Sequence, residues 1–422
     1  MNPFVIQPIR QPFDVSVTLP GSKSIALRQL TIAALTNGVT QLHGLPPCDD
    51  IDAMLDCLTA LGVRQTGSYD SLTLHGPMQM QGNVTLNARM SGASTRLLIG
   101  LAAIRQGTTT IDGHPSLRVR TNAPLFDVLR QHGCAVDSDN GQLPAVIHGG
   151  FEPTNPIQID GSLSSQYITA LMVIAPLLAK QSIDIEITGA LVSRPYLDIT
   201  AAELSKRGIA ASWIDTNRLQ IQCGEYQTGA ATVEGDATAA TYFAALATLH
   251  GSRIQLTNLG QSTQQGDYQF FAIMEQLGAN VSRSETQTII QGPEKLQSLA
   301  QIDMTTMPDA ALTLIAMGPL LPDGIHITGL SSLHHKECDR LLCPANEFAS
   351  LGVSTDTTDD TIRLHPAASP LVSHQLNTYH DHRMAMAFSV FASRTEPLPI
   401  DDARVVDKTF PAYWDEYLRL SA

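Results

Sequence analysis

The sequence is poor in aromatic residues and in positive charge. Phe, Trp and Tyr make up 5% of its 422 residues, and 26 Lys and Arg stand against 40 Asp and Glu, which gives a formal net charge of −14. Nucleic-acid surfaces combine a basic face with stacking rings, so this composition argues against a nucleic-acid partner. Hydrophobic residues make up 43% of the chain, which at this length indicates a globular protein of two or three domains.

Long apolar segments and paired-cysteine motifs are also missing. The longest apolar run, residues 167–179, is too short to span a bilayer, and residues 1–5 lack the features of a secretory signal. None of the six cysteines forms a CxxC pair, so we expect reduced, mostly buried thiols in a cytoplasmic protein. Walker A, Rossmann, zinc and Ser-His-Asp patterns are absent. In the segment 380–382 the side chains of the two histidines diverge, and no matching carboxylate or cysteine set is evident, so we expect no metal there.

A unit of about 72 residues recurs six times along the chain. Each copy begins with an apolar helix, followed by a short alternating strand and a second, amphipathic helix. Equivalent turns of the apolar helices lie at Ala33, Ala102, Ala175, Ala247, Ala316 and Ala392, and glycines end the second helices at Gly62, Gly133, Gly208, Gly278 and Gly352. Further strands close each copy, so we predict an α/β protein built from β-α-β-β units.

The first helix of each unit is apolar nearly all round, which is typical of a helix buried inside a domain. Six such units could form one closed ring, an open solenoid or two groups of three. We expect two globular halves, because solenoids usually have shorter repeats and distinct end caps. The sixth unit reaches the C-terminus before its closing strands, and we expect the N-terminal strand at residues 15–19 to complete it.

Compact polar clusters stand where the apolar helices begin and in nearby loops. Free backbone N–H groups and the helix dipole favour anions at such positions. Because this acidic chain gathers its few cations there, we expect a small, strongly anionic ligand. The clusters contain Lys23, Ser24 and Arg28; Gly92; Ser164, Ser165 and Gln166; Asp309; Lys336, Glu337 and Arg340; Arg383; and Lys408.

Each cluster taken alone has a plainer interpretation. The first fits a serine N-cap with a solvated lysine, the second a small-residue turn, and Asp309 an acidic N-cap. Alternatively, Asp309 is a general base whose pKa is set by nearby cations. On a helix, Lys336 and Arg340 would share one face and need a compensating anion, for which Glu337 is a candidate. The recurrence of polar clusters at equivalent places favours the functional interpretation.

Taken in order, these motifs resemble the 5-enolpyruvylshikimate-3-phosphate synthases. The resemblance covers about residues 4–417 and rests on residues 19–24 with Arg28, 164–166, 233–236, 336–337 with 339–340, 381–386 and 408–411. It implies a two-domain inside-out α/β barrel with three repeats per domain. The domains would be residues 1–20 with 234–422 and residues 21–233, with the active site in the cleft between them.

The resemblance also implies an activity. The enolpyruvyl group of phosphoenolpyruvate would pass to the 5-hydroxyl of shikimate 3-phosphate through a tetrahedral addition–elimination intermediate, with release of phosphate. This is a step of the shikimate pathway of aromatic amino acid biosynthesis, carried out by a cytoplasmic monomer without metal or organic cofactor. The substrates are small molecules, and no nucleic acid or membrane is involved.

Site residues follow from the matching motif positions. The resemblance implies that Asp309 and Glu337 act as the acid/base pair, assisted by Lys23, without assigning a step to either carboxyl. The shikimate 3-phosphate set is Lys23, Ser24, Arg28, Ser164, Ser165, Gln166, Ser193, Tyr196, Asp309, Ser332 and Lys336. The phosphoenolpyruvate set is Lys23, Gly92, Arg120, Gln166, Arg340, Arg383 and Lys408.

Several positions depart from the family pattern. Met90 stands where asparagine is usual, Ala93 where threonine is usual, and Ser332 where asparagine is usual. We therefore expect altered binding of glyphosate, an inhibitor that occupies the phosphoenolpyruvate site. Two other functions stay open: the sister enolpyruvyl transferase acting on UDP-N-acetylglucosamine, and a catalytically silent anion-binding relative.

Overall fold

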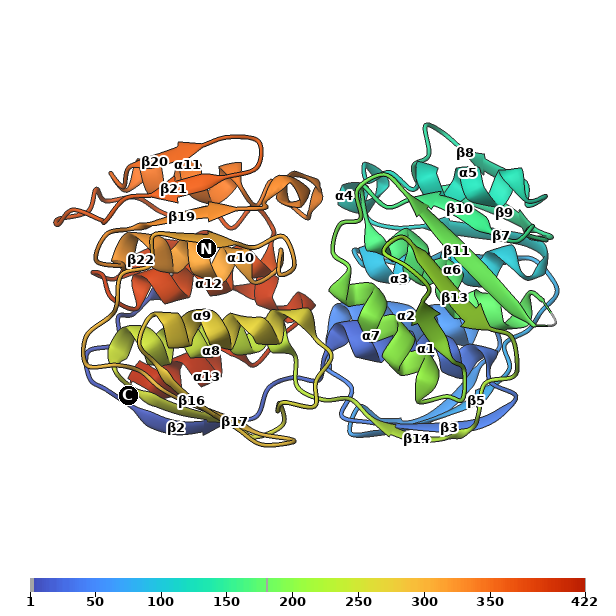
Figure 1. The fold of residues 1–422 in the computed structure, drawn as a ribbon, viewed down its shortest axis with the longest axis horizontal. Coiled ribbons are helices and arrows are strands. Elements are labelled where there is room, and N and C mark those ends of the chain that lie inside the picture. The colour runs from blue at the N-terminus through green and yellow to red at the C-terminus, as the bar shows by residue number, and fades with distance from the viewer. Residues whose placement is uncertain (1–3, 180, 422) are drawn as a thin grey trace. The chain divides into compact units, whose positions relative to one another are not determined.

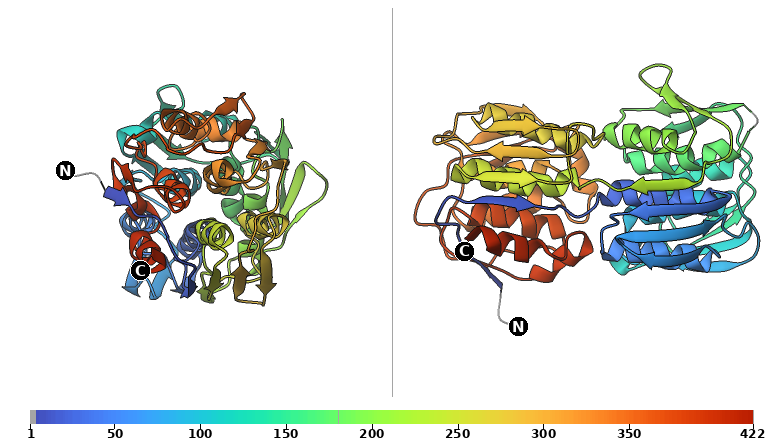
Figure 2. Two further views of the ribbon diagram at one scale, coloured as in Figure 1. Left: turned by 90° about the vertical axis from the view of Figure 1, so that its left-hand side faces the viewer. Right: turned by 90° about the horizontal axis from the view of Figure 1, so that it is seen from below.

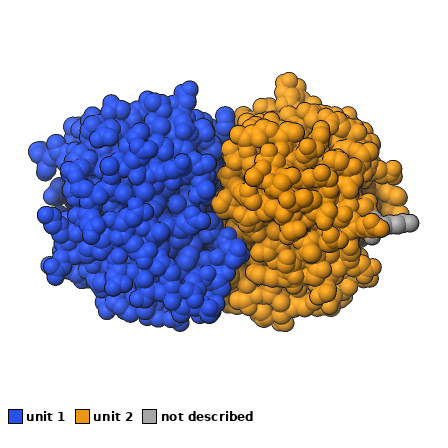
Figure 3. Space-filling model, in the orientation of Figure 1, with its two compact units in different colours: residues 1–20, 235–422 blue, residues 21–234 orange. Residues whose placement is uncertain are grey.

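The computed structural model describes residues 4–179 and 181–421. The chain divides into two compact units: unit 1 contains Met1–Pro20 and Gly235–Ala422, and unit 2 contains Gly21–Glu234 (Figure 3). Each unit has its own hydrophobic core. The fold is α/β with mixed sheets, as predicted.

Unit 2 is built around three apolar helices that pack against one another (Figure 1). They are α1 (Lys23–Leu35), α3 (Gly92–Ala103) and α6 (Ser165–Ile174), the last continued by the 3-10 turn η1 (Ala175–Leu177). Nearly every side chain of these helices is buried, because a helix that is apolar all round must be covered on every side. The prediction of buried leading helices is therefore confirmed.

Three four-stranded mixed sheets cover these helices in unit 2. Each has one parallel pair at an edge, followed by two antiparallel strands. The sheet orders are β14-β3-β5-β4, β6-β7-β9-β8 and β10-β11-β13-β12. The strands are β3 (Gly38–His43), β4 (Arg64–Ser68), β5 (Ser71–Gly76), β6 (Val84–Asn87), β7 (Gln106–Asp112), β8 (Val136–Ser138), β9 (Ala145–Gly149), β10 (Ile157–Asp160), β11 (Ser182–Thr188), β12 (Ala211–Trp213), β13 (Arg218–Gln222) and β14 (Gly229–Thr232).

Unit 1 repeats this plan. Its apolar helices α8 (Ala237–His250), α10 (Ala311–Met317) and α12 (His382–Ala392) also pack against one another, and the 3-10 turn η3 (Gly318–Leu320) continues α10. Figure 2 shows strands toward the outside of the unit and helices toward its middle. Its sheets have the orders β16-β17-β15-β2, β18-β19-β21-β20 and β1-β22. The strands are β1 (Phe4–Ile6), β2 (Asp14–Val17), β15 (Arg253–Leu256), β16 (Asn280–Arg283), β17 (Thr288–Gln291), β18 (Gln301–Asp303), β19 (Ile325–Thr328), β20 (Thr355–Thr357), β21 (Ile362–Leu364) and β22 (Leu398–Ile400).

The second helices of the repeat end as predicted on left-handed glycines. Gly62, Gly133, Gly208, Gly278 and Gly352 all have φ between 81° and 101°, a conformation that costs glycine little and other residues more. The helices are α2 (Asp49–Ala60), α5 (Ala123–Gln131), α7 (Pro195–Ser205), α9 (Phe270–Gln276) after η2 (Gly266–Gln269), α11 (Leu342–Ser350) and the terminal α13 (Tyr413–Ser421). Shorter pieces are α4 (Pro115–Arg118), η4 (Ser331–His335) and η5 (Ala403–Lys408).

The prediction for the N-terminal strand is wrong. Strand β2, in the segment expected to complete the last sheet, pairs in parallel with β15 of the fourth repeat, and β1 pairs antiparallel with β22 of the sixth. The reason lies at the two chain crossings. Strand β2 stays in unit 1 while the next helix, α1, lies in unit 2, and β14 stays in unit 2 while the next helix, α8, lies in unit 1. At each crossing, the last strand before the chain changes unit is an edge strand of the unit that the chain leaves: β2 pairs with β15 in unit 1, and β14 pairs with β3 in unit 2.

No helix within residues 4–179 and 181–421 combines the length and apolar character that crossing a membrane requires.

Candidate active site

The apolar helices become accessible where they begin. Their few half-buried positions include Lys23 and Ser24 of α1, Gln166 of α6 and Arg383 of α12, whereas the following turns are buried. Asp309, just before α10, is half-buried as well. Lys23, Ser24, Gln166 and Arg383 are thus the accessible tips of otherwise inaccessible helices, and core packing fixes their position.

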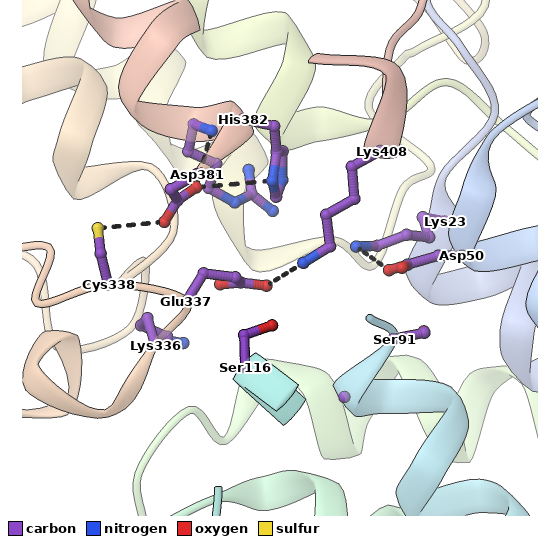
Figure 4. A network of polar contacts seen from close by, with 12 residues as sticks. Lys23, Asp50, Ser91, Ser116, Lys336, Glu337, Cys338, Asp381, His382 and Lys408 are labelled. Atoms are coloured by element: carbon purple, nitrogen blue, oxygen red, sulfur yellow. Dashed lines mark hydrogen bonds and ion pairs between the residues drawn. The ribbon is translucent and has the colours of Figure 1, made fainter. Parts of the chain in front are cut away.

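In unit 2, Lys23 pairs with a carboxylate that sequence reasoning missed. Lys23 Nζ donates to Asp50 Oδ2 at 2.8 Å (Figure 4), and the Asp50 side chain is only 3% exposed. Asp50 lies in the first turn of α2, where acidic residues are favoured by the helix dipole. Because acidic residues are common at this position of a helix, the sequence alone does not indicate that Asp50 contacts Lys23. Ser22 is not the simple N-cap allowed above, since its side chain makes no capping bond.

Arg28 lies inside unit 2 and braces three helices. Its guanidinium donates to Ser24 O at 2.7 Å, Thr200 Oγ1 at 2.8 Å and Tyr196 O at 3.0 Å, which ties α1 to α7. A longer bond of 3.4 Å reaches Thr169 Oγ1 in α6. Burial lowers the pKa of Arg28 to about 10. The structure therefore gives Arg28 a packing role that its place in the motif did not reveal.

Two guanidinium groups cover the start of α3. A Cβ atom at Gly92 would lie 2.6 Å from Nη1 of Arg120 and 2.8 Å from Nη1 of Arg96. Arg96 also donates to Gly92 O and to Thr121 O, each at 3.0 Å. A side chain at position 92 would displace the arginines, so the glycine allows cations to lie directly on the helix terminus.

Serine hydroxyl groups lie at the start of α6 and in the loop before α7 in unit 2. Ser164 Oγ accepts from the Gln166 N–H at 3.3 Å, which caps α6, and Ser165 is buried beside it. Ser193 has φ +56°, uncommon for a residue with a side chain and frequent at ligand sites. Ser193 O accepts from the Tyr196 N–H at 3.1 Å, just before α7.

In unit 1, Asp309 is held by three cations. Its carboxylate lies 3.0 Å from Arg340 Nη1, 3.3 Å from Lys336 Nζ and 3.4 Å from Arg383 Nη2. Helix α10 begins two residues later, with Ala310 at its N-cap, so the alternative of an acidic N-cap is wrong. Two segments far apart in the sequence, residues 336–340 and the start of α12, thus converge on one carboxylate.

Arg340 is the centre of this cluster. Besides Asp309, it donates to Glu337 Oε2 at 2.7 Å and, through Nε, to Asp381 Oδ2 at 2.7 Å. Burial alone would lower the pKa of Arg340, but the carboxylates of Asp381, Glu337 and Asp309 raise it above its ordinary value. Lys336 and Arg340 do not lie on a helix, the arrangement considered above, because η4 ends at His335 and α11 begins at Leu342. The two cations meet through Asp309 instead of a shared helix face.

Glu337 links this centre to the last predicted cation. Lys408 Nζ donates to Glu337 Oε1 at 3.0 Å, and Lys408 is 9% exposed (Figure 4). Ser332, the remaining predicted contact, is half-buried in η4. Lys336, Arg340, Arg383 and Lys408 therefore face the carboxylates of Asp309, Glu337 and Asp381. Such a cluster favours a polyanion, and its carboxylates can exchange protons.

A second carboxyl that the sequence did not reveal, Asp267, interacts electrostatically with Asp309. Asp267 in η2 is buried and accepts a hydrogen bond from Thr238 Oγ1 of α8. Burial, with the charge of Asp309, raises the pKa of Asp267 to about 7. Burial likewise raises the pKa of Tyr242 to about 12, although the neighbouring Arg383 opposes the shift. In the sequence, nothing except its position directly after Gly266 distinguishes Asp267 from other acidic residues.

Within the described ranges 4–179 and 181–421, no group of three or more His, Cys, Asp and Glu side chains is arranged to hold a metal ion. The segment 380–382, weighed above as a metal motif, has another role. Asp381 is the N-cap of α12 and accepts from the Arg383 N–H at 2.9 Å. His382 is buried, with Nδ1 3.5 Å from Asp381 Oδ1.

Comparison with known proteins gives one consistent result. Residues 8–417 match the family described as EPSP synthase (3-phosphoshikimate 1-carboxyvinyltransferase). The chain is similar to 3-phosphoshikimate 1-carboxyvinyltransferases from Klebsiella pneumoniae (35% identity; 100% of this chain and 99% of the relative) and Edwardsiella ictaluri (36%; 98% of each). It also resembles the solved structure of an EPSP synthase from Acinetobacter baumannii, with a TM-score of 0.79 and 23% identity over 99% of this chain and 97% of that one.

Proposed function

The chain belongs to the EPSP synthase family, and we propose that the polar groups at its helix openings carry out the family's reaction. The enzyme transfers the enolpyruvyl group of phosphoenolpyruvate to shikimate 3-phosphate in the shikimate pathway. It is a transferase, and the alternative acceptor UDP-N-acetylglucosamine is not favoured by the family match. The observation that carries the site assignment is the convergence of Lys336, Arg340 and Arg383 on Asp309.

The reaction needs two kinds of help from the protein. The methylene carbon of phosphoenolpyruvate must gain a proton while the 5-hydroxyl of the acceptor loses one, and the resulting tetrahedral intermediate must then return the carbon proton and expel phosphate. Carboxyl groups supply the proton transfers, and fixed cations stabilise the phosphates and the carboxylate of the substrates. Both kinds of group occur in the cluster around Asp309.

We assign the acid/base work to Asp309 and Glu337, with Lys23 assisting. Both carboxylates are half-buried and held by cations, Asp309 by three and Glu337 by Arg340 and Lys408. An arriving anion competes for these same cations. As it draws them away from a carboxylate, that carboxylate becomes a stronger base, because the opposite charge that favoured its ionised form is now shared. Substrate binding thereby prepares the proton acceptor.

Binding roles divide between the two sets of residues. We propose that the hydroxyl-rich set binds shikimate 3-phosphate: Lys23, Ser24, Arg28, Ser164, Ser165, Gln166, Ser193, Tyr196, Asp309, Ser332 and Lys336. The cation-rich set binds phosphoenolpyruvate: Lys23, Gly92, Arg120, Gln166, Arg340, Arg383 and Lys408. Serine caps and helix N–H groups suit a phosphate, and guanidinium groups suit a carboxylate with a phosphate. Arg28 acts in this scheme mainly by fixing α1, because its donors are engaged within the protein.

The departures at Met90 and Ala93 concern the same helix opening as Gly92 and Arg120. We propose that they change the affinity for glyphosate more than the reaction itself. The double variant Met90→Asn with Ala93→Thr restores the usual residue types, and its inhibition constant for glyphosate should differ from that of the unaltered enzyme. Equal inhibition constants, together with an unchanged KM for phosphoenolpyruvate, would remove the basis of this proposal.

We propose an inside-out α/β barrel for each unit, and contributions of residues from both units to one reaction. We also propose that the protein is a monomer, so that light scattering should give the mass of one chain. The six free cysteines agree with a reducing compartment such as the cytoplasm.

One assay tests the function as a whole. Phosphate release from phosphoenolpyruvate is measured with shikimate 3-phosphate and, separately, with UDP-N-acetylglucosamine. Release is expected only with shikimate 3-phosphate, and the variants Asp309→Ala and Lys23→Met should lose it. Release only with the sugar nucleotide, or with neither acceptor, would contradict the proposal.

A further inference from the structure

The segment that leads into α12 has an unusual backbone. Tyr379 and His380 both adopt left-handed conformations, with φ of +54° and +56°. Such conformations are uncommon for residues with a side chain, and they persist only where the surrounding contacts hold them. The next residue is Asp381, the N-cap of α12 and a partner of Arg340. Two consecutive strained residues therefore stand directly before the Arg340 cluster.

A buried carboxyl on α11 holds this segment. Glu347 Oε1 accepts a hydrogen bond from the Tyr379 hydroxyl at 2.6 Å, and Oε2 accepts from the Asn377 N–H at 3.1 Å. The ring Nε2 of His374 lies 3.0 Å from the same Oε2. A buried carboxyl is costly to leave without hydrogen bonds. Glu347 therefore favours the one arrangement of the segment that supplies all three contacts.

The segment is linked to the cluster by short hydrogen bonds around Asp381. The Asp381 N–H donates to Thr378 O at 2.9 Å, which closes the turn that contains the two strained residues. The Asp381 carboxylate accepts from Arg340 Nε at 2.7 Å and from the Arg383 N–H at 2.9 Å. Arg383 Nη2 in turn lies 3.4 Å from Asp309. The shape of the turn therefore helps to set where both guanidinium groups lie.

Glu347 and Arg340 contact this segment from one continuous stretch of chain. Helix α11 begins two residues after Arg340 and carries Glu347. The stretch is joined to residues 377–383 at both ends, by the Arg340–Asp381 ion pair and by the Glu347–Tyr379 hydrogen bond. Loss of the second contact lets the strained turn relax, and Asp381 then no longer faces Arg340 in the same way.

We propose that Glu347 is a positioning residue, which holds the left-handed turn at residues 379–380 and thereby orients Asp381 and Arg383. The effect on catalysis rests on the proposed function of the Arg340 cluster, whereas the effect on the turn does not. Arg340 and Arg383 belong to the residues proposed to bind phosphoenolpyruvate, so this substrate should respond most. A misplacement of about 1 Å can cost about 10²-fold in rate, and we expect a smaller shift here to lower kcat/KM for phosphoenolpyruvate about tenfold.

Steady-state kinetics of Glu347→Gln in the full-length enzyme provide the first test. The amide keeps the shape of the side chain but replaces one acceptor oxygen with a donor group. The KM for phosphoenolpyruvate should rise, whereas the KM for shikimate 3-phosphate, most of whose proposed contacts lie in unit 2, should change by less than about twofold. Loss of folded protein alone would lower kcat and leave both KM values unchanged. An unchanged kcat/KM for phosphoenolpyruvate would overturn the proposal.

The matched control is Asp184→Asn, at a buried carboxylate far from the helix openings in the sequence. Asp184 lies on β11 and pairs with Arg218 of β13. Its side chain is 9% exposed, against 7% for Glu347. This variant should lower Tm, as Glu347→Gln does, but keep the kinetic constants of the unaltered enzyme. Equal kinetic effects of the two variants would overturn the proposal.

A rescue variant separates a hold on the turn from any other role of Glu347. His380 is exposed, and glycine adopts its left-handed conformation at little cost. The double variant Glu347→Gln with His380→Gly should therefore form the turn without the carboxyl. We expect it to recover at least about threefold of the lost kcat/KM. A double variant as impaired as Glu347→Gln would overturn the proposal.

Hydrogen exchange measures the turn without reference to activity. The N–H groups of Asn377, Tyr379 and Asp381 all donate hydrogen bonds within this arrangement. Their exchange, followed by mass spectrometry of the full-length protein, should be faster in Glu347→Gln and unchanged in Asp184→Asn. Unchanged exchange in Glu347→Gln would overturn the proposal. Faster exchange in an enzyme that is inactive with shikimate 3-phosphate even when unaltered would instead contradict the proposed function.

A milder variant carries the test if Glu347→Gln does not fold. Tyr379→Phe removes one hydroxyl that donates to Glu347 and leaves the carboxyl in place. A hydrogen bond of this kind is modest in net terms, so kcat/KM for phosphoenolpyruvate should fall about threefold. The exchange of the same three N–H groups should again be faster. No change in either measurement would overturn the proposal.

Discussion

The apolar helices of the two units begin with different chemistry, although the units share one plan. In unit 2, serine hydroxyls cap α3 and α6, and the buried arginines Arg28 and Arg96 donate to backbone carbonyls. In unit 1, α12 begins at the carboxylate of Asp381, which pairs with Arg340. An anion arriving at unit 2 meets hydroxyl groups as well as the Lys23–Asp50 pair, whereas an anion arriving at unit 1 must compete with the carboxylates of Asp309, Glu337 and Asp381 for several cations. The first suits binding, and the second suits proton transfer coupled to binding.

The variant Asp309→Asn should show the largest effect and sharpen this comparison. It keeps the shape of the side chain but removes the charge that three cations share. We expect kcat to fall by about 10²- to 10⁴-fold, with no rise in the KM for phosphoenolpyruvate, because the freed cations still attract an anion. Steady-state kinetics measure both constants.

The matched control is Asp323→Asn, at an exposed carboxylate of the same unit, which should leave both constants unchanged. If Asp309→Asn raised the KM for phosphoenolpyruvate and spared kcat, Asp309 would contribute to binding alone and not to proton transfer, and the contrast between the units would fail.

The next effect concerns stability. Arg340→Met leaves the buried carboxylate of Asp381 without its guanidinium partner. Removing one member of a buried ion pair costs about 3–5 kcal/mol, since the other charge stays in a poorly solvated site. We expect a loss of this size in the free energy of unfolding of unit 1, measured by urea denaturation followed by tryptophan fluorescence and circular dichroism.

Arg283→Met provides the matched control within the same unit. Arg283 pairs with Glu275 at 2.8 Å, but both side chains are partly exposed, at 27% and 38%. Such pairs contribute about 1 kcal/mol or less. Similar losses in the two variants would show that the buried Arg340 ion pairs contribute no more to the free energy of unfolding than a partly exposed ion pair does.

Local pattern was enough to predict the repeated elements. Apolar helices, alternating strands and glycine caps each depend on short stretches of sequence, and the structure places Gly62 and Gly352 at the predicted helix ends. Strand partners depend on the whole chain. The segment containing β2 reads as an ordinary strand, and nothing in its residues indicates that it pairs with β15 instead of β22.

The candidate site divides in a similar way. Residues within recurring motifs, such as Lys23 and Asp309, could be selected from the sequence because they stand at helix openings. Asp50 and Asp267 could not, because acidic residues near helix starts are common and only tertiary packing brings them to Lys23 and Asp309. The packing role of Arg28 was hidden for the same reason, since its acceptors are mainly backbone carbonyls and threonine hydroxyls.

Asp50→Asn tests whether the carboxylate that pairs with Lys23 at the start of α1 contributes to catalysis, as the carboxylates of unit 1 are proposed to do. The substitution removes the negative charge that Lys23 Nζ contacts at 2.8 Å, and hydrogen bonds to charged groups contribute about 1.5–3 kcal/mol. If only part of this reaches the transition state, kcat/KM should fall about tenfold. Asp49→Asn, at the adjacent carboxylate that pairs with Arg89 at a partly exposed site, should change kcat/KM by less than about twofold. Equal effects would mean that Lys23 needs no fixed partner.

A further expected effect is a change in the pH dependence of stability. The pKa of Asp267 is raised from 3.8 to about 7 by burial and by Asp309, so the folded protein holds this proton more tightly than the unfolded chain does. The stabilisation is therefore complete below about pH 4 and is lost as the pH rises through about 7. Asp267→Asn imitates the protonated carboxyl and should flatten the fall in Tm between pH 5 and pH 8, while the exposed control Asp415→Asn should not. A parallel fall in all three proteins would mean that Asp267 is ionised throughout, and this buried carboxyl would then be one more paired charge of unit 1.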